Sequence, residues 1–136
     1  MTNPETKSET KSETKSTESF LTLEEQIILF KKAKQKIYLK KNWTTSVFAR
    51  NAAGNPVNSG NKSAICWCTL GAVYSLTSNP VKRFAVNDTI YRCSPTARKY
   101  GDVATANDVG GHKMAIRILN ETIKALTAEL KAEQKE

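Results

Sequence analysis

The sequence predicts a mainly α-helical domain with a small β element (α+β), with about four or five helices and a short hairpin. Residues 23–40 and 112–131 each carry apolar side chains three and four positions apart, as one face of an amphipathic helix does. Ala64–Leu76 is apolar on almost every side, which is typical of a helix buried in a small domain. Residues 43–57 combine β-forming side chains with a turn, which predicts the hairpin.

We expect residues 20–136 to form a single globular domain, preceded by a disordered low-complexity tail in residues 1–19. Residues 5–16 are three copies of Glu-Thr-Lys-Ser, and they contain no apolar side chain. Such a tract cannot offset the entropy that is lost when a chain becomes ordered, so its composition predicts disorder.

The first predicted helix begins after Thr22 and ends near Lys40. Thr22 and Glu25 match a capping box, in which each side chain accepts a hydrogen bond from the other residue's backbone N–H. The apolar stripe of this helix consists of Leu23, Ile27, Phe30, Ala33 and Ile37. Six lysines crowd its second half and the residues that follow: Lys31, Lys32, Lys34, Lys36, Lys40 and Lys41.

The hairpin and the central helix follow this first helix. Trp43–Arg50 is rich in β-forming residues, residues 51–56 supply a turn, and Val57 resumes an extended run. We expect the central helix to occupy Ala64–Leu76, with Ser63 as its N-cap. A bilayer-spanning helix takes about 20 apolar residues, so this segment is too short to cross a membrane.

A capping residue followed by proline marks the start of each of two shorter helices. Asn79-Pro80 predicts a helix that ends near Val86, and Ser94-Pro95 predicts another that stops at Gly101. Asp102–Ala106 is expected to be extended. The next five residues, Asn107-Asp108-Val109-Gly110-Gly111, are expected to form a loop with a capping aspartate, before a long helix from His112 to about Lys131.

The charge of the chain favours a polyanionic partner. The formal net charge is +8, and residues 1–19 hold three lysines and four glutamates (net −1), so the remaining residues carry +9. Such an excess is typical of proteins that bind nucleic acid or an acidic protein surface, although it also serves solubility. The six lysines of the first helix are the predicted contacts, and lysines suit the phosphate backbone better than base edges.

A second hypothesis is a cysteine-dependent hydrolase or transferase. Cys68 lies near the start of the central helix, whose dipole can lower a thiol pKa, and His112 is the candidate base. The competing interpretation is that Cys68 is a small buried hydrophobe. A metal site of Cys66, Cys68, Cys93 and His112 is disfavoured by the Cys-x-Cys spacing, so no metal or cofactor is predicted.

Gly110-Gly111-His112-Lys113 suggests an anion site at the start of the last helix. The alternative is a plain turn that requires glycine. A further hypothesis, a structural protein that interacts through helices, comes from the apolar stripe of the last helix. Three cysteines with no apolar secretory signal predict a cytoplasmic protein with free thiols, without a transmembrane segment.

Several short motifs occur together between Trp43 and Leu130 and resemble an uncharacterised bacterial domain-of-unknown-function family. They are Trp43, Phe48-Ala49-Arg50, Ala52–Val57, the helix Cys68-Thr69-Leu70-Gly71-Ala72, and Asn107-Asp108-Val109-Gly110-Gly111. The chain departs from the family after Gly111, where the family carries Arg-Thr and this chain has His112-Lys113. The resemblance implies one compact domain and no particular activity. The leading hypothesis comes from the charge instead: a small cytoplasmic binding or regulatory protein that engages a polyanionic or acidic partner through the lysine-rich first helix.

Overall fold

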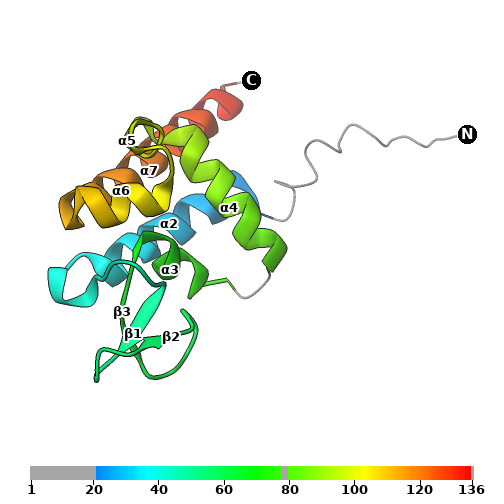
Figure 1. Ribbon diagram of the computed structural model, residues 1–136. Helices are drawn as coiled ribbons and strands as arrows, with labels where there is room; N and C mark the ends of the chain where they lie inside the picture. Colours follow the sequence, from blue (N-terminus) through cyan, green and yellow to red (C-terminus); the bar gives the residue numbers. More distant parts are fainter. Residues whose placement is uncertain (1–20, 78–79, 136) are drawn as a thin grey trace, which may run out of the picture.

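The computed structural model describes residues 21–77 and 80–135, and within them it has six α-helices and a small antiparallel sheet (Figure 1). The predicted fold class is confirmed. The predicted tail in residues 1–19 and the Asn79 N-cap lie outside the described residues. The elements in chain order are α2 (Leu23–Ile37), the 3₁₀ helix η2 (Lys40–Asn42), β1 (Ala49–Asn51), β2 (Pro56–Val57), β3 (Ala64–Trp67), α3 (Thr69–Tyr74), α4 (Pro80–Cys93), α5 (Pro95–Tyr100), α6 (Val103–Gly110) and α7 (His112–Gln134).

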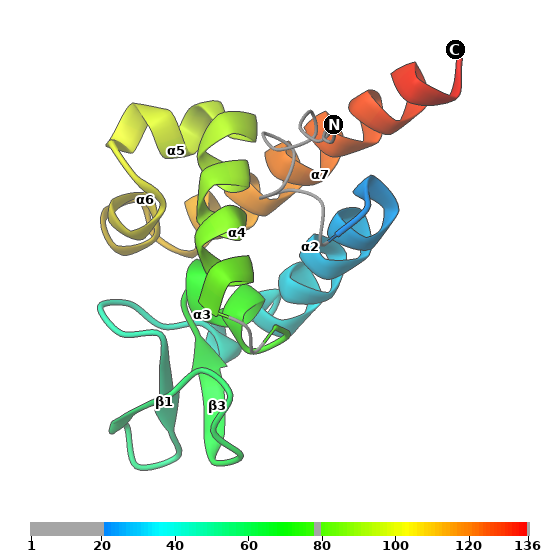
Figure 2. The ribbon, with the colours of Figure 1, turned by 90° about the vertical axis from the view of Figure 1, so that its right-hand side faces the viewer.

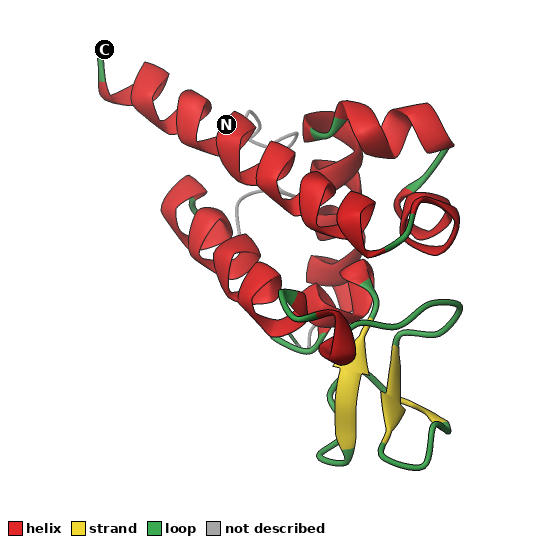
Figure 3. Ribbon diagram, turned by 90° about the vertical axis from the view of Figure 1, so that its left-hand side faces the viewer, coloured by secondary structure: helices red, strands yellow, loops and turns green. Residues whose placement is uncertain are grey.

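Helices α2 and α7 lie side by side and run in opposite directions (Figures 2 and 3). The core between the helices includes Phe30 and Ile37 of α2 and Ile118 and Leu119 of α7, all fully buried. Burial of such apolar side chains is the main favourable contribution to folding. No helix in the described part of the chain has the length and apolar character that a membrane crossing demands.

The capping box at the start of α2 is confirmed. Thr22 Oγ1 accepts a hydrogen bond from the Glu25 N–H at 3.0 Å, and Glu25 Oε1 accepts one from the Thr22 N–H at 2.8 Å. The helix ends at Ile37 rather than near Lys40, because the chain turns at Tyr38 and Leu39 and then tightens into η2.

The predicted hairpin is present, but it belongs to a three-stranded sheet of order β2-β1-β3. The prediction that the central helix starts at Ala64 is wrong. Ala64–Trp67 is instead the third strand, which pairs antiparallel with β1, and Ser63 caps no helix. The helix begins only at Thr69, with Cys68 as its N-cap. Strand pairing with a distant segment outweighs the helical tendency of a short apolar run, which is ambiguous when read alone.

Gly71 lets α3 lie directly against the loop before β1. A Cβ atom at this position would be 1.9 Å from the carbonyl oxygen of Phe48. No residue with a side chain fits that approach without movement of the backbone, so glycine is required where sheet and helix meet.

The second half of the chain is more helical than expected. Helix α4 continues to Cys93 instead of ending near Val86, whereas α5 has the predicted Ser94 cap and ends at Gly101. Residues 102–106 are not extended and residues 107–111 are not a loop, because Val103–Gly110 forms α6. Asp102 Oδ1 caps this helix by accepting a hydrogen bond from the Thr105 N–H at 2.7 Å.

Helices α6 and α7 are separated by Gly111 alone. Gly111 has a φ of +87°, a conformation that favours glycine, and the next residue already starts α7. The expected capping role of Asp108 is therefore wrong, since α7 has no side-chain cap and Asp108 bonds elsewhere.

Candidate functional site

Asn107 joins three parts of the fold through its side-chain amide. Its Oδ1 accepts hydrogen bonds from Trp43 Nε1 at 2.8 Å, from the Thr69 N–H at 2.9 Å and from Thr69 Oγ1 at 2.8 Å. Its Nδ2 donates to the carbonyl oxygen of Thr44 at 3.1 Å. Only 1% of Asn107 is exposed. A buried amide satisfied in this way fixes the relative positions of the loop before β1, α3 and α6.

The neighbouring Asp108 holds the same loop at Ser46. Its Oδ1 accepts hydrogen bonds from the Ser46 N–H at 3.0 Å and from Asn107 Nδ2 at 2.9 Å. Ser46 has a φ of +73°, and it is the only non-glycine residue with a positive φ in the described chain. Such a conformation is disfavoured for residues with a side chain, so the bond to Asp108 helps to keep the loop in this shape.

Arg50 connects the loop before β1 to the turn of the hairpin. Its guanidinium donates to Thr44 Oγ1 at 2.9 Å, to the carbonyl oxygen of Gly54 at 3.0 Å and to that of Thr45 at 3.2 Å. The motif residues Trp43, Arg50, Asn107 and Asp108, far apart in the sequence, thus gather around residues 43–48. The other motif residues lie in or beside α3: Cys68, Leu70, Gly71 and Ala72.

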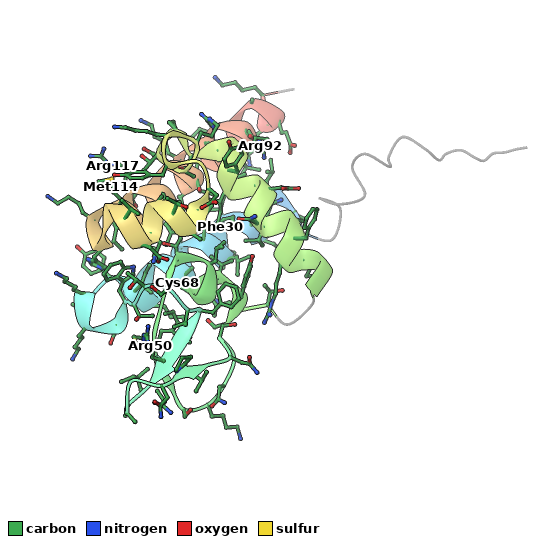
Figure 4. The ribbon with its side chains drawn as sticks, in the orientation of Figure 1. Phe30, Arg50, Cys68, Arg92, Met114 and Arg117 are labelled. Atoms are coloured by element: carbon green, nitrogen blue, oxygen red, sulfur yellow. The ribbon has the colours of Figure 1, made fainter. Side chains whose placement is uncertain are left out.

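A pocket of about 640 Å³ opens between this loop, the hairpin and α6. Its walls include Phe48 and Val57 of the β element, Leu70 of α3, and Asp108 of α6. Cys68 also lines it and lies where the sheet meets the helices (Figure 4). The sequence singled out Cys68, Leu70 and Asp108, but it did not place them around one cavity.

The environment of Cys68 is poorly suited to a nucleophile. Burial raises the pKa of its thiol, and the charge of Asp108 adds to this effect, which outweighs the hydrogen bond from the Gly71 N–H to Sγ at 3.3 Å. A raised pKa lowers the thiolate fraction, and the thiolate is the reactive form. The structure thus gives Cys68 the packing and capping role that competed with catalysis.

His112 contacts the end of α2 and the ring of Trp43. Its Nε2 lies 2.7 Å from the carbonyl oxygen of Ile37, and its ring meets the Trp43 ring edge-on with centroids 5.5 Å apart. His112 therefore ties the start of α7 to the end of α2. Within residues 21–77 and 80–135, no group of three or more His, Cys, Asp or Glu side chains could hold a metal ion. Cys66, Cys68 and Cys93 are free thiols.

The predicted anion site lies at the junction of α6 and α7. Gly110 is the last residue of α6, and the Gly111 N–H donates to the carbonyl oxygen of Asn107 at 3.3 Å. Lys113 is exposed, but His112 is engaged by Ile37. Gly111, with its positive φ, makes the turn between the two helices.

The six lysines of α2 and η2 do not form a single patch. Lys31 and Lys34 line a groove between α2 and α7, whereas Lys36 Nζ lies 4.0 Å from the centroid of the Trp67 ring. Each residue of an α-helix turns by about 100°, so Lys32 is carried to the opposite flank from Lys34. Lys40 and Lys41 are exposed, and both belong to η2.

This α2–α7 groove has a volume of about 400 Å³. Its lining consists of Lys31, Lys34 and Gln35 of α2, Tyr38 directly after this helix, and Asn120 and Ile123 of α7. On α7, Lys113, Arg117, Asn120 and Lys124 recur four, three and four positions apart, so they share one face of the helix. The sequence did not mark Tyr38 or Asn120 as site residues. Ile123 belongs to the apolar stripe that predicts the last helix, and here it lines the groove.

Comparison of the chain with models of protein families, with curated proteins and with solved structures finds no match.

Proposed function

We propose that this protein binds single-stranded nucleic acid through the α2–α7 groove. The observation that carries the proposal is the position of Tyr38, whose ring lines the groove beside Lys31 and Lys34 and whose surface is 60% exposed. Proteins that bind single strands combine cationic side chains for the phosphates with aromatic rings on which bases stack.

The charge around the groove supports a polyanionic ligand. Residues 31–41 contain six lysines and no carboxylate. In residues 113–124 the single carboxylate, Glu121, is turned toward α5, where its Oε1 accepts hydrogen bonds from Ser94 Oγ and the Thr96 N–H. The carboxylate of Glu121 is thus engaged at α5, and the field of the lysines of α2 and α7 would attract phosphates.

Tyr38 favours nucleic acid over an acidic protein surface as the partner. An exposed aromatic ring offers a base a flat face for stacking, which contributes about 1–3 kcal/mol per base. Lysines contact phosphates without reading sequence, so binding should be largely independent of base order. The free thiols of Cys66, Cys68 and Cys93 support a reducing, cytoplasmic setting, which is part of the same proposal.

The test is fluorescence anisotropy with a labelled oligonucleotide of mixed sequence, about 16 nucleotides long. We expect binding at about 50 mM salt that weakens steeply by about 200 mM, because counterions are released when phosphates are neutralised. Lys31→Glu with Lys34→Glu should weaken binding by about tenfold or more. Lys62→Glu with Lys99→Glu makes the same change of charge at exposed positions outside the groove, and should weaken it far less.

If the two double variants weakened nucleic-acid binding equally, the overall charge of the protein would explain the effect, and this result would contradict a binding groove. Absence of binding at low salt would contradict the proposal altogether. A protein that bound an acidic polypeptide such as polyglutamate as tightly as the oligonucleotide would favour an acidic protein partner instead.

A further inference from the structure

The pocket between the loop before β1, the hairpin and α6 has an apolar side and a polar side. Val47, Phe48, Val57 and Leu70 give it an apolar side, and Ser46 and Asp108 lie among its polar groups. Its volume of about 640 Å³ falls within the range of about 300–1,000 Å³ that is usual for small-molecule sites. A ligand that filled it would bury an apolar body and present a polar end to the few polar groups.

Asp108 sets the charge that this pocket accepts. Among the lining residues that the structure describes, it is the only aspartate or glutamate, and none of them is a lysine or arginine. Its Oδ1 already accepts two hydrogen bonds, from the Ser46 N–H and from Asn107 Nδ2. Its Oδ2 has no hydrogen-bond partner in the part of the chain that the structure describes, so this oxygen is available to a donor on a ligand.

The pocket is also held in a fixed shape before any ligand arrives. Ser46, on its wall, keeps its disfavoured backbone conformation at φ +73° through the bond to Asp108. Asn107, beneath it, bonds to Trp43, Thr44 and Thr69. A preformed pocket saves the entropy of ordering on binding, and locally strained backbone is often found at binding sites.

We propose that this pocket is a binding site for a small organic amine with an apolar body. The protonated nitrogen donates to Asp108 Oδ2, and the apolar body packs against Phe48 and Leu70. The ammonium adds the attraction between opposite charges to the hydrogen bond, whereas an alcohol of the same shape offers the carboxylate only a hydrogen bond, so the amine is preferred. The site is separate from the groove between α2 and α7, because the lining residues described for the two have no member in common.

The experiment is an NMR titration of the full chain with three probes of similar shape: 2-phenylethylamine, 2-phenylethanol and 3-phenylpropionate. The backbone N–H groups of Ser46 and Gly71 report on the pocket, since they bond to Asp108 and to Cys68. We expect saturable shifts of both signals with the amine, binding about tenfold weaker with the alcohol, and none with the carboxylate. Equal binding of all three probes, or no shift with the amine, would overturn the proposal.

Two variants distinguish the contribution of the Asp108 charge to binding from that of the cavity. Asp108→Asn keeps an oxygen that can accept from Ser46 but removes the charge, so the preference for the amine over the alcohol should disappear. Ala104→Trp fills the pocket from an exposed position of α6 and should abolish both complexes. Ala128→Trp, at an exposed position of α7 outside the pocket, is the matched control and should bind as the natural chain does. Retained amine preference in Asp108→Asn would contradict the assigned contact.

Discussion

The indole Nε1 of Trp43 donates a hydrogen bond of 2.8 Å to Oδ1 of Asn107, although 64 positions separate the two residues. The same oxygen accepts from the backbone and the hydroxyl of Thr69. One acceptor thus connects the loop before the sheet with two helices. The three donors, the Trp43 indole and the backbone N–H and hydroxyl of Thr69, thus have the same defined acceptor, which helps to specify how these segments pack.

Replacement of Asn107 should therefore be costly. Asn107→Ala leaves the Trp43 indole and the Thr69 N–H and hydroxyl without their acceptor, and each unsatisfied buried group costs about 1–3 kcal/mol. We expect the free energy of unfolding, measured with urea, to fall by about 3 kcal/mol or more. Asn120→Ala, at an exposed position of α7, should change it by less than about 0.5 kcal/mol.

A second prediction concerns the contact between α3 and the loop before β1. Gly71→Ala would place a methyl group 1.9 Å from the carbonyl oxygen of Phe48, so either the helix or the loop must move. We expect a loss of about 1–3 kcal/mol in unfolding free energy, as for other overpacked sites. Gly60→Ala meets no atom within 4 Å and should leave stability nearly unchanged. A Gly71→Ala protein as stable as the Gly60→Ala protein would contradict this contact.

The thiol of Cys68 should be slow to alkylate. Burial raises its pKa above the ordinary value of 9.0, so little thiolate is present at neutral pH. In a variant with Cys66→Ser and Cys93→Ala, the rate of reaction with iodoacetamide should keep rising with pH beyond the point where a small free thiol levels off. A rate at neutral pH above that of a free thiol would revive the cysteine-dependent enzyme as a hypothesis.

The carboxylate of Glu121 should make stability depend on pH. Burial acts to raise its pKa, but hydrogen bonds from Ser94 and Thr96, together with the charge of Arg117, lower it overall. A group with a lowered pKa in the folded state binds fewer protons there than in the unfolded state, so stability is lost as the pH falls through that folded pKa. Glu121→Gln should reduce the difference in melting temperature between neutral and acidic pH, whereas Glu133→Gln, at an exposed position, should not.

Removal of the Tyr38 ring should weaken nucleic-acid binding without changing its salt dependence. Tyr38→Ala deletes the stacking surface but leaves Lys31 and Lys34, and therefore the counterions released, as they were. We expect affinity in the anisotropy measurement to fall by about five- to a hundredfold. Tyr91→Ala removes a ring that is 42% exposed on α4, outside the groove, and should leave affinity unchanged. A changed salt slope would mean that Tyr38 positions the lysines instead of contacting a base.

Amphipathic periodicity was sufficient to predict α2 and α7, because each buries one regular stripe in the core. It was insufficient for Ala64–Trp67 and for Val103–Gly110. The first became a strand because it pairs with β1, which is a long-range effect that a local pattern does not contain. The second is a helix that begins after the N-cap residue Asp102, but its short apolar pattern also fits an extended chain.

The candidate sites were predicted in composition but not in arrangement. The lysines of α2 were identified, yet the helix distributes them over two flanks, and Lys36 is used against Trp67. The motif residues Asn107 and Asp108 were expected in a loop, and their role depends on Thr44, Ser46 and Thr69, which only the fold brings near. A local sequence pattern does not show which distant segments the fold brings together, and this part of a site could not be predicted.

The pairing of α2 with α7 has a consequence for how the chain is made. The contact between Ile37 and His112 spans 75 positions, so α2 leaves the ribosome long before its main partner exists. Until α7 has been translated, the apolar stripe of α2 has no final cover and is open to chaperones or to wrong associations. The domain should therefore acquire its native form only after α7 has been translated.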